Sequence, residues 1–160
     1  MANYNGMMVA RRVGDVGEAV SKSILEACGF QVQDVSRNPD YYEKGDLIAT
    51  KNGKSYFIEV KTDTRAHETG NLVVELISNV EAKRTGWFNY CKCDKYFFYL
   101  AKSNELIIVD RLELRKCGCY MNTCETEQND NYIAYKTGVI GKISISKVKE
   151  LCPSFRRIQL

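Results

Sequence analysis

Two carboxylates and one ammonium group are expected to meet at the open end of a β-hairpin. Glu59 and Lys61 stand two residues apart in a β-rich run, so their side chains share one face of an extended strand. Counting back from the Asn-Gly turn at 52–53 brings Asp46, at the start of the partner strand, close to Glu59. Carboxylate oxygens are ligands that Mg²⁺ selects, and a nearby lysine can orient a water, or act as its base if the lysine pKa is lowered. Bound Mg²⁺ lowers the pKa of water and stabilises charge on a phosphoryl oxygen, so these residues suit phosphoryl chemistry.

A surface salt bridge is the alternative interpretation of the same three residues. Such a bridge on adjacent strands contributes about 0–1 kcal/mol and carries no function. The strands themselves, however, contain nearly continuous apolar runs at Leu47–Ala49 and Tyr56–Ile58, which favours a central position covered on both faces. Three charges at such a place are costly unless they bind something. Both interpretations remain open on spacing alone.

A helix, a strand and the hairpin are expected to position these charges. Apolar residues at helical spacing predict a helix over Gly14–Cys28, ended by Gly29. Asp15 as the N-cap and Glu18 three residues later suit a capping box at its start. The strands expected next are Phe30–Val35, Asp46–Thr50 and Ser55–Lys61.

The rest of the chain predicts further strands and short helices. The strands are expected at Leu72–Ile77, Lys95–Ala101, Leu106–Val109, Tyr132–Tyr135 and Val139–Ile145. Short helical segments are expected after Ile77, over Asp110–Lys116, and as a closing helix over Ser146–Leu151. A helix, a run of strands and a crossover to another strand imply an α/β fold with a mixed sheet. With 160 residues and no repeat or Gly/Ser-rich linker, the chain is expected to form one domain over residues 1–160.

Charge is small overall and uneven along the chain. The net charge is +3, too small to indicate a nucleic-acid partner by itself. Residues 133–160 carry six basic residues against one acid, which gives +5 and leaves −2 for the remainder. This basic segment is interpreted as a phosphate-facing surface, with a solvated lysine face as the alternative. The basic residues are Lys136, Lys142, Lys147, Lys149, Arg156 and Arg157.

Composition argues against export and membrane insertion. No apolar run reaches the roughly 18 residues that a membrane span needs, and the first residues do not resemble an export signal. The expected location is therefore cytoplasmic, where the seven cysteines would stay reduced. Their Cys-x-Cys spacing differs from the usual zinc knuckle, so free thiols are expected and a thiolate-bound zinc or iron–sulfur cluster is the alternative. The cysteines in question are Cys91, Cys93, Cys117, Cys119 and Cys124.

At the hairpin the sequence resembles a known family of nucleases. Gly45-Asp46-Leu47-Ile48, followed by Phe57-Ile58-Glu59-Val60-Lys61, is similar to the Asp…Glu-x-Lys core of the PD-(D/E)xK nuclease superfamily. The preceding helix and strand resemble the start of that fold as seen in Holliday-junction resolvase-like members. The resemblance implies a restriction-endonuclease-like core, with a mixed central sheet flanked by helices in the order αβββαβ. That core would span about 13–101, with extra C-terminal strands and a helix over 102–160.

The resemblance implies a role for each charged residue. Asp46 and Glu59 would be metal ligands, and Lys61 would position the attacking water. Glu18 matches the helix-borne acid that many members aim at the same ion, although a capping-box residue is the alternative. The implied cofactor is Mg²⁺, with Mn²⁺ as a substitute and no organic cofactor.

One departure from the family pattern concerns the proline. The only Pro-Asp pair, Pro39-Asp40, lies in the loop before the hairpin rather than at its start. Asp46 is the better match, so Gly45 stands where the family name has proline.

The function implied is a metal-dependent DNA endonuclease, with branched DNA and a homodimer suggested by the resolvase-like members. A non-catalytic nucleic-acid-binding module with the same fold is the first alternative. A structural protein with a thiolate metal site is the second. The sequence does not decide between DNA and RNA, and one fold hosts many functions.

Weaker candidates surround the motif. Glu75 could add a carboxylate, with a solvent-facing position as the alternative. Thr62 and Asp63 could touch a phosphate backbone, with polar loop residues of no such role as the equal alternative. His67, the only histidine, is expected in a solvated loop. Aromatic residues interleaved with basic ones could stack on bases, or else pack into the core. They are Trp87, Phe88 and Tyr90, with Lys83, Arg84 and Lys92.

Overall fold

The computed structural model describes residues 4–130 and 133–160, with side chains described over 12–126 and 138–160. The helices are α1 (Tyr4–Ala27), α2 (Ala66–Thr69), α3 (Trp87–Tyr90), α4 (Arg111–Lys116) and α5 (Ile145–Leu151), with 3₁₀ turns η1 (Pro39–Tyr41) and η2 (Cys117–Tyr120). The first strands are β1 (Gln31–Asp34), β2 (Leu47–Lys51), β3 (Lys54–Asp63), β4 (Asn71–Asn79) and β5 (Arg84–Thr85). The later strands are β6 (Lys95–Leu100), β7 (Glu105–Asp110), β8 (Asn122–Asp130), β9 (Ile133–Ser144) and β10 (Arg156–Gln159).

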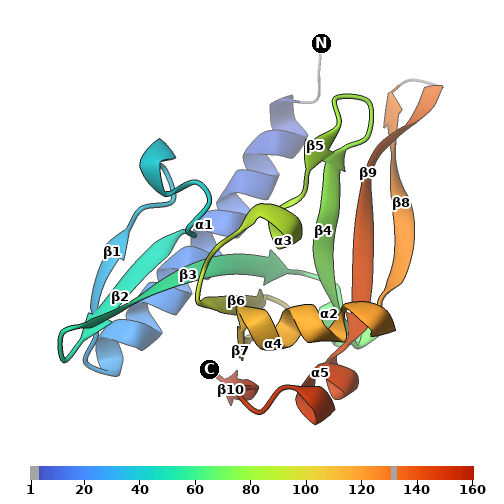
Figure 1. Cartoon of the computed structure of the whole chain (residues 1–160). Coiled ribbons are helices and arrows are strands. Elements are labelled where there is room, and N and C mark those ends of the chain that lie inside the picture. Colours follow the sequence, from blue (N-terminus) through green and yellow to red (C-terminus); the bar gives the residue numbers. More distant parts are fainter. Residues whose placement is uncertain (1–3, 131–132) are drawn as a thin grey trace.

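A six-stranded mixed sheet forms the centre of the molecule, in the order β1-β2-β3-β6-β7-β10. Strand β3 pairs with β6 in parallel, and the other neighbours are antiparallel. This confirms the predicted α/β class with a mixed sheet. Figure 1 shows α1 running along one face of this sheet. The α1 face of the core is made by Leu25, Leu47, Ala49, Ile58, Val60, Phe97, Tyr99 and Leu106.

The predicted hairpin is confirmed, and its turn explains its register. Asn52 and Gly53 both have positive φ angles, 52° and 74°, as a two-residue type I′ turn requires. Lys51 therefore stands opposite Lys54, and Leu47 stands opposite Ile58. Asp46, the residue just before β2, therefore lies beside the middle of β3.

A second sheet, which the sequence did not predict, lies beside the first. Strands β5-β4-β9-β8 form this sheet, and Figure 1 shows β4, β9 and β8 rising on one side of the central sheet. The expected strand Leu72–Ile77 exists as β4 and belongs to this second sheet. Gly70, with φ 65°, ends α2 and redirects the chain away from β3. The second sheet packs on the central one through a core that includes Leu72, Val74, Trp87, Phe98, Ile107 and Ile143.

Several predicted boundaries need correction. α1 begins at Tyr4, so Asp15 and Glu18 lie within the helix and the predicted capping box is wrong. Gly14 and Gly17 are weak helix formers, so the sequence did not indicate that the helix extends back to Tyr4. The predicted stop is confirmed, since Gly29 has φ 82° just after the helix. The predicted helical segment after Ile77 is only partly right, because the chain forms β5 before the short α3.

The C-terminal part holds two strands that were not predicted. β8 has the sequence NTCETEQND, which offers no apolar alternation to indicate a strand. α5 matches the predicted closing helix but does not close the chain, because β10 follows it at the edge of the central sheet. Of the predicted strand Tyr132–Tyr135, residue 132 lies outside the described residues, and the rest belongs to β9. No helix in the described part of the chain is long and apolar enough to cross a membrane.

Candidate active site at the open end of the hairpin

The structure brings Asp46, Glu59 and Lys61 together, as the turn geometry predicts. The backbone N–H of Asp46 donates to the carbonyl of Ile58 (2.8 Å), one residue out of the register in which Leu47 stands opposite Ile58. Asp46 Oδ2 accepts from the backbone N–H of Val60 (2.8 Å). Lys61 Nζ lies 2.6 Å from Glu59 Oε1. We refer to Asp46, Glu59 and Lys61 as the acidic cluster.

Gly45 makes this close approach possible. Its φ is 125°, in the region that L side chains rarely adopt, and a Cβ built there would lie 2.5 Å from the carbonyl oxygen of Ile58. Proline is excluded at this position because its ring fixes φ near −65°. Glycine at position 45 therefore allows the backbone conformation that brings Asp46 against β3.

Burial rules out a simple surface salt bridge. Glu59 is only 5% exposed. Its second oxygen, Oε2, accepts from the thiol of Cys91 (3.5 Å), while Lys61 Nζ lies 5.0 Å from the centre of the Trp87 ring. Lys61 keeps contact with solvent, with 31% of its side chain exposed. Within the cluster, Glu59 is buried in the protein and its partner Lys61 is partly exposed to solvent.

The electrostatics of the cluster set the protonation of its members. Burial, and then the neighbouring Glu59, raise the pKa of Asp46 to about 7. Burial alone would lower the pKa of Lys61, but Glu59 and Asp46 outweigh it and the lysine pKa rises. The raised pKa favours Lys61 as a charged hydrogen-bond donor near neutral pH over the alternative role of a base with a lowered pKa.

Glu18 faces the same cluster from α1. It lines a cleft of about 370 Å³ together with Asp46. Burial raises the pKa of Glu18, although a hydrogen bond with Ser36 opposes the rise. The cleft is completed by Gly14, Asp15, Ser36 and Arg37. The structure therefore favours the helix-borne acid over the capping-box residue.

Gly17 explains why α1 can place Glu18 there. A Cβ on Gly17 would lie 2.1 Å from the hydroxyl oxygen of Thr62 on β3, so only glycine allows the helix to lie so close to the strand. The Thr62 hydroxyl is buried under the helix, with no hydrogen-bond partner in the described part of the chain. The prediction that Thr62 touches a phosphate backbone is therefore wrong.

The donor set fits a hard divalent cation only in part. Carboxylates in a shared, partly buried cleft repel one another, which is one cause of the high pKa of Asp46, and a cation would relieve that repulsion. Within the described residues, however, no three His, Cys, Asp or Glu side chains already stand in metal-binding geometry. Glu59 is held by Lys61 and Cys91, so binding would require its carboxylate to turn.

The weaker candidates have local partners. Asp63 Oδ1 accepts from the backbone N–H groups of Arg65 and Ala66, so it caps α2. Glu75 lies in the second sheet opposite Ile140, away from the acidic cluster in the topology. His67 is on α2, which corrects the predicted loop position, and Nε2 lies 3.4 Å from the carboxylate of Glu68.

The aromatic and basic segment divides between the core and the surface. Trp87 and Phe88 are buried, which favours core packing over base stacking. Tyr90 stacks on the exposed Tyr42 at 4.9 Å, and Lys92 pairs with Glu43. These contacts join α3 to the loop that precedes Asp46.

The cysteines are free thiols, as expected, and the described ones do not gather in one thiolate group. Cys91 contacts Glu59, whereas Cys117 Sγ lies 3.5 Å from Cys152 Sγ. Cys119 is exposed. Sequence reasoning missed the contact of Cys91 with Glu59 and that of Trp87 with Lys61, because both depend on where α3 packs and no local pattern encodes that.

Comparison with known proteins yields only distant structural likenesses. Neither a scan against protein-family models nor a search of curated proteins finds a match. The structure of a bacterial homing endonuclease is similar with a TM-score of 0.49 and 17% identity, over 63% of this chain and 68% of that chain. A nuclease from a fusselovirus is similar with a TM-score of 0.40 and 12% identity, over 87% of this chain and 83% of that chain. Scores below 0.5 do not place this chain in the family of either protein.

Proposed function

We propose that this protein is a metal-dependent endonuclease of the PD-(D/E)xK type that hydrolyses phosphodiester bonds in DNA. The observation that carries the proposal is the acidic cluster itself. The backbone N–H of Val60 holds Asp46, the side chain of Lys61 contacts Glu59, and Glu18 lines a cleft together with Asp46. A charged set of this kind, partly buried and open to solvent on one side, suits a phosphate ester and a cation.

Each residue has a distinct role in this proposal. Asp46 and Glu59 would hold Mg²⁺, or Mn²⁺ in its place, with Glu18 as a further ligand. When bound, the cation lowers the pKa of water and stabilises charge on the phosphoryl group. Lys61 uses one N–H on Glu59 and has further N–H donors for the attacking water or a phosphate oxygen. Val60 fixes the orientation of Asp46 through its backbone N–H.

Cleavage assays test the proposal directly. Linear, nicked and four-way DNA, and one RNA, are incubated with the protein and Mg²⁺ or Mn²⁺, alongside Asp46→Ala and Lys61→Ala. Asp40→Ala is the matched control, because Asp40 belongs to the only Pro-Asp pair but lies in η1, which precedes the hairpin, and does not line the cleft of Asp46 and Glu18. Cleavage that requires the metal, is lost in Asp46→Ala and Lys61→Ala, and persists in Asp40→Ala is expected. Wild-type cleavage by the Asp46→Ala and Lys61→Ala variants would contradict the assigned site.

Selectivity for branched DNA and a homodimer are finer parts of the proposal. They rest on the resemblance of the motif to resolvase-like members, and paired incisions need two active sites. Gel filtration with four-way DNA should give a complex of two chains per junction, and both strands should be nicked within one complex. A strict monomer on DNA would remove paired incision and leave the hydrolytic site as proposed.

A non-catalytic nucleic-acid-binding module is the second candidate, favoured by one observation. In the described part of the chain, metal-binding geometry is not preassembled, because Glu59 already contacts Lys61 and Cys91. If Glu59 stays so engaged, the protein would bind DNA without cutting it. Metal-independent binding of DNA with no cleavage of any substrate would establish this candidate in place of the enzyme.

A further inference from the structure

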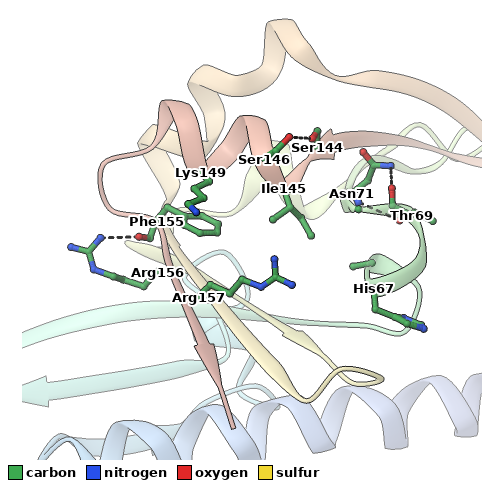
Figure 2. A pocket seen from close by; sticks show the side chains of 12 residues that line it. His67, Thr69, Asn71, Ser144, Ile145, Ser146, Lys149, Phe155, Arg156 and Arg157 are labelled. Carbon is green, nitrogen blue, oxygen red and sulfur yellow. Dashed lines mark hydrogen bonds between the residues drawn. The ribbon is translucent and has the colours of Figure 1, made fainter.

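A second cavity, larger than the active-site cleft, opens between α2, α5 and β10. Its volume is about 770 Å³. Figure 2 shows its walls: His67 and Asn71 on one side, α5 with Lys149 above, and the guanidinium of Arg157 reaching between them. We refer to this cavity as the basic groove. It is lined by Ala66, His67, Thr69, Gly70, Asn71, Ser144, Ile145, Ser146, Lys149, Phe155, Arg156 and Arg157.

The charges of the basic groove are unbalanced. None of its lining residues is acidic. Arg157 is held by Glu105 through two bonds, from Nε (2.7 Å) and Nη2 (2.9 Å). Arg156 lies at the edge of the groove, where Figure 2 shows its guanidinium turned away from Arg157, and it donates only to backbone carbonyls in its described contacts. Lys149 has no carboxylate partner among the described ion pairs. Two cations without counter-charges, beside a guanidinium that is already oriented, attract an anion.

The remaining lining groups suit a phosphodiester better than a cation or an apolar ligand. Hydroxyl groups of Ser144 and Ser146 lie 2.7 Å apart at the rim, and the amide of Asn71 is beside them. Phe155 contributes a half-buried aromatic surface that packs against the core. Basic, hydroxyl and aromatic groups along one concave surface are the combination that follows a nucleic-acid backbone.

The walls of the groove are fixed with respect to the strand that carries the acidic cluster. The backbone N–H of Ile145 donates to the carbonyl of Gly70 (2.9 Å), which ties α5 to the end of α2. Asp63, the last residue of β3, caps α2 through its carboxylate. From Glu59 to Asp63 the strand covers about 13 Å, so the groove begins well within one turn of a DNA duplex from the acidic cluster.

From these observations we infer that the basic groove is a phosphate-backbone site for nucleic acid, separate from the acidic cluster. Lys149 and Arg156 supply the uncompensated charge, and Arg157 supplies an oriented guanidinium. The choice of nucleic acid as the ligand rests on the proposed function, whereas the anion site itself does not. The groove would hold the strand beyond the scissile bond and contribute the salt-dependent part of the affinity.

Binding measured without catalysis tests this inference. A fluorescent 30-base-pair DNA is titrated with protein in EDTA at several salt concentrations, comparing wild type with the double variant Lys149→Ala/Arg156→Ala. Both residues are exposed and lack a carboxylate partner among the described residues, so the fold should be unaffected. The matched control is Lys22→Ala/Lys54→Ala, which removes the same charge from α1 and from the hairpin turn.

The expected result is a dissociation constant about tenfold higher in the groove variant than in wild type, with the slope of log K against log salt reduced by about 2. The control variant should keep the wild-type slope. Equal affinities and slopes in the two double variants, or no DNA binding by wild type, would overturn the inference. Inorganic phosphate is the second probe: a site that binds phosphate in a Lys149-dependent way but no DNA would be a small-anion site, which also overturns it.

The outcomes separate this inference from the proposed function. If the wild type cuts DNA and the groove variant binds DNA normally, the proposed enzyme function stands and the proposed role of the groove is rejected. If the wild type cuts no DNA but the groove variant loses affinity and has a smaller salt slope, the role of the groove stands and the proposed enzyme function is rejected.

Discussion

The acidic cluster and the basic groove are built in opposite ways. The cluster comes from two consecutive strands and one turn; Glu59 is buried and paired with Lys61, and Asp46 is held by a backbone N–H. The groove comes from two segments more than 70 residues apart, 66–71 and 144–157, and its charges are exposed. A site that must place charges against one another is held by the rigid hairpin. A surface that needs only attract a backbone tolerates long, solvated side chains.

The largest expected effect comes from a substitution that removes the charge of Lys61 and keeps a side chain of similar volume. Lys61→Met should lower kcat for DNA cleavage by about 10²–10³-fold, because the positioned N–H donors are lost. The affinity for DNA in EDTA should change less than threefold, since the groove supplies the backbone contacts. Single-turnover cleavage and anisotropy measure the two effects. A matching fall in affinity would mean that the two regions are not separate in function.

The second prediction concerns the backbone that positions Asp46. Gly45→Ala should lower the free energy of unfolding by about 3 kcal/mol, because alanine would combine a positive φ with a clash against Ile58. Gly14→Ala is the control. It lies in α1 with nothing within 4 Å of the added Cβ, so it should stabilise the protein by roughly 0.5–1 kcal/mol. Urea denaturation measures both, and equal effects at the two glycines would contradict the strain at Gly45.

The third prediction follows from the pKa of Asp46. The folded protein raises this pKa from the ordinary value of 3.8 to about 7, so between these pH values the folded state binds more protons than the unfolded state. Stability without metal should therefore fall as pH rises through this window. Asp46→Asn keeps an acceptor for Val60 and lacks the charge. It should be roughly 2 kcal/mol more stable than wild type at pH 8, and equal to it near pH 4. Thermal melts in EDTA check this, and parallel pH profiles would contradict it.

The smallest expected effect is a coupling near zero. Because the groove and the acidic cluster share no described contact, the losses in kcat/KM caused by Lys61→Met and Lys149→Ala should add. The double variant should match the product of the single losses within about twofold. A coupling larger than tenfold would show that the groove acts through the cluster, and the comparison between them would have to be revised.

The same contrast explains what the sequence could predict. The turn at Asn52-Gly53 sets the register, the register brings Asp46 to Glu59, and strand alternation adds Lys61. Each step is local, so the proximity of these three residues was predictable. Glu18 was suggested only by resemblance, because its position depends on the close approach of Gly17 to Thr62.

The second sheet and the groove could not be predicted in this way. β8 pairs its polar sequence with β9, and only that pairing defines it as a strand. The C-terminal basic residues were recognised as a group, but which of them meet in one cavity depends on α5 and β10 folding back against α2. Packing between distant segments, rather than local pattern, decides both features.

Proton release on cation binding tests the central claim most directly. Mn²⁺ or Mg²⁺ is titrated into the protein at pH 6.5 by calorimetry, in two buffers of different ionisation enthalpy. With a pKa of about 7, Asp46 is largely protonated at this pH, so a cation that binds its carboxylate must release that proton. We predict proton release in the wild type, with neither proton release nor tight binding in Asp46→Asn. Cation binding of equal strength in Asp46→Asn, or binding without proton release in wild type, would contradict a metal site at the acidic cluster.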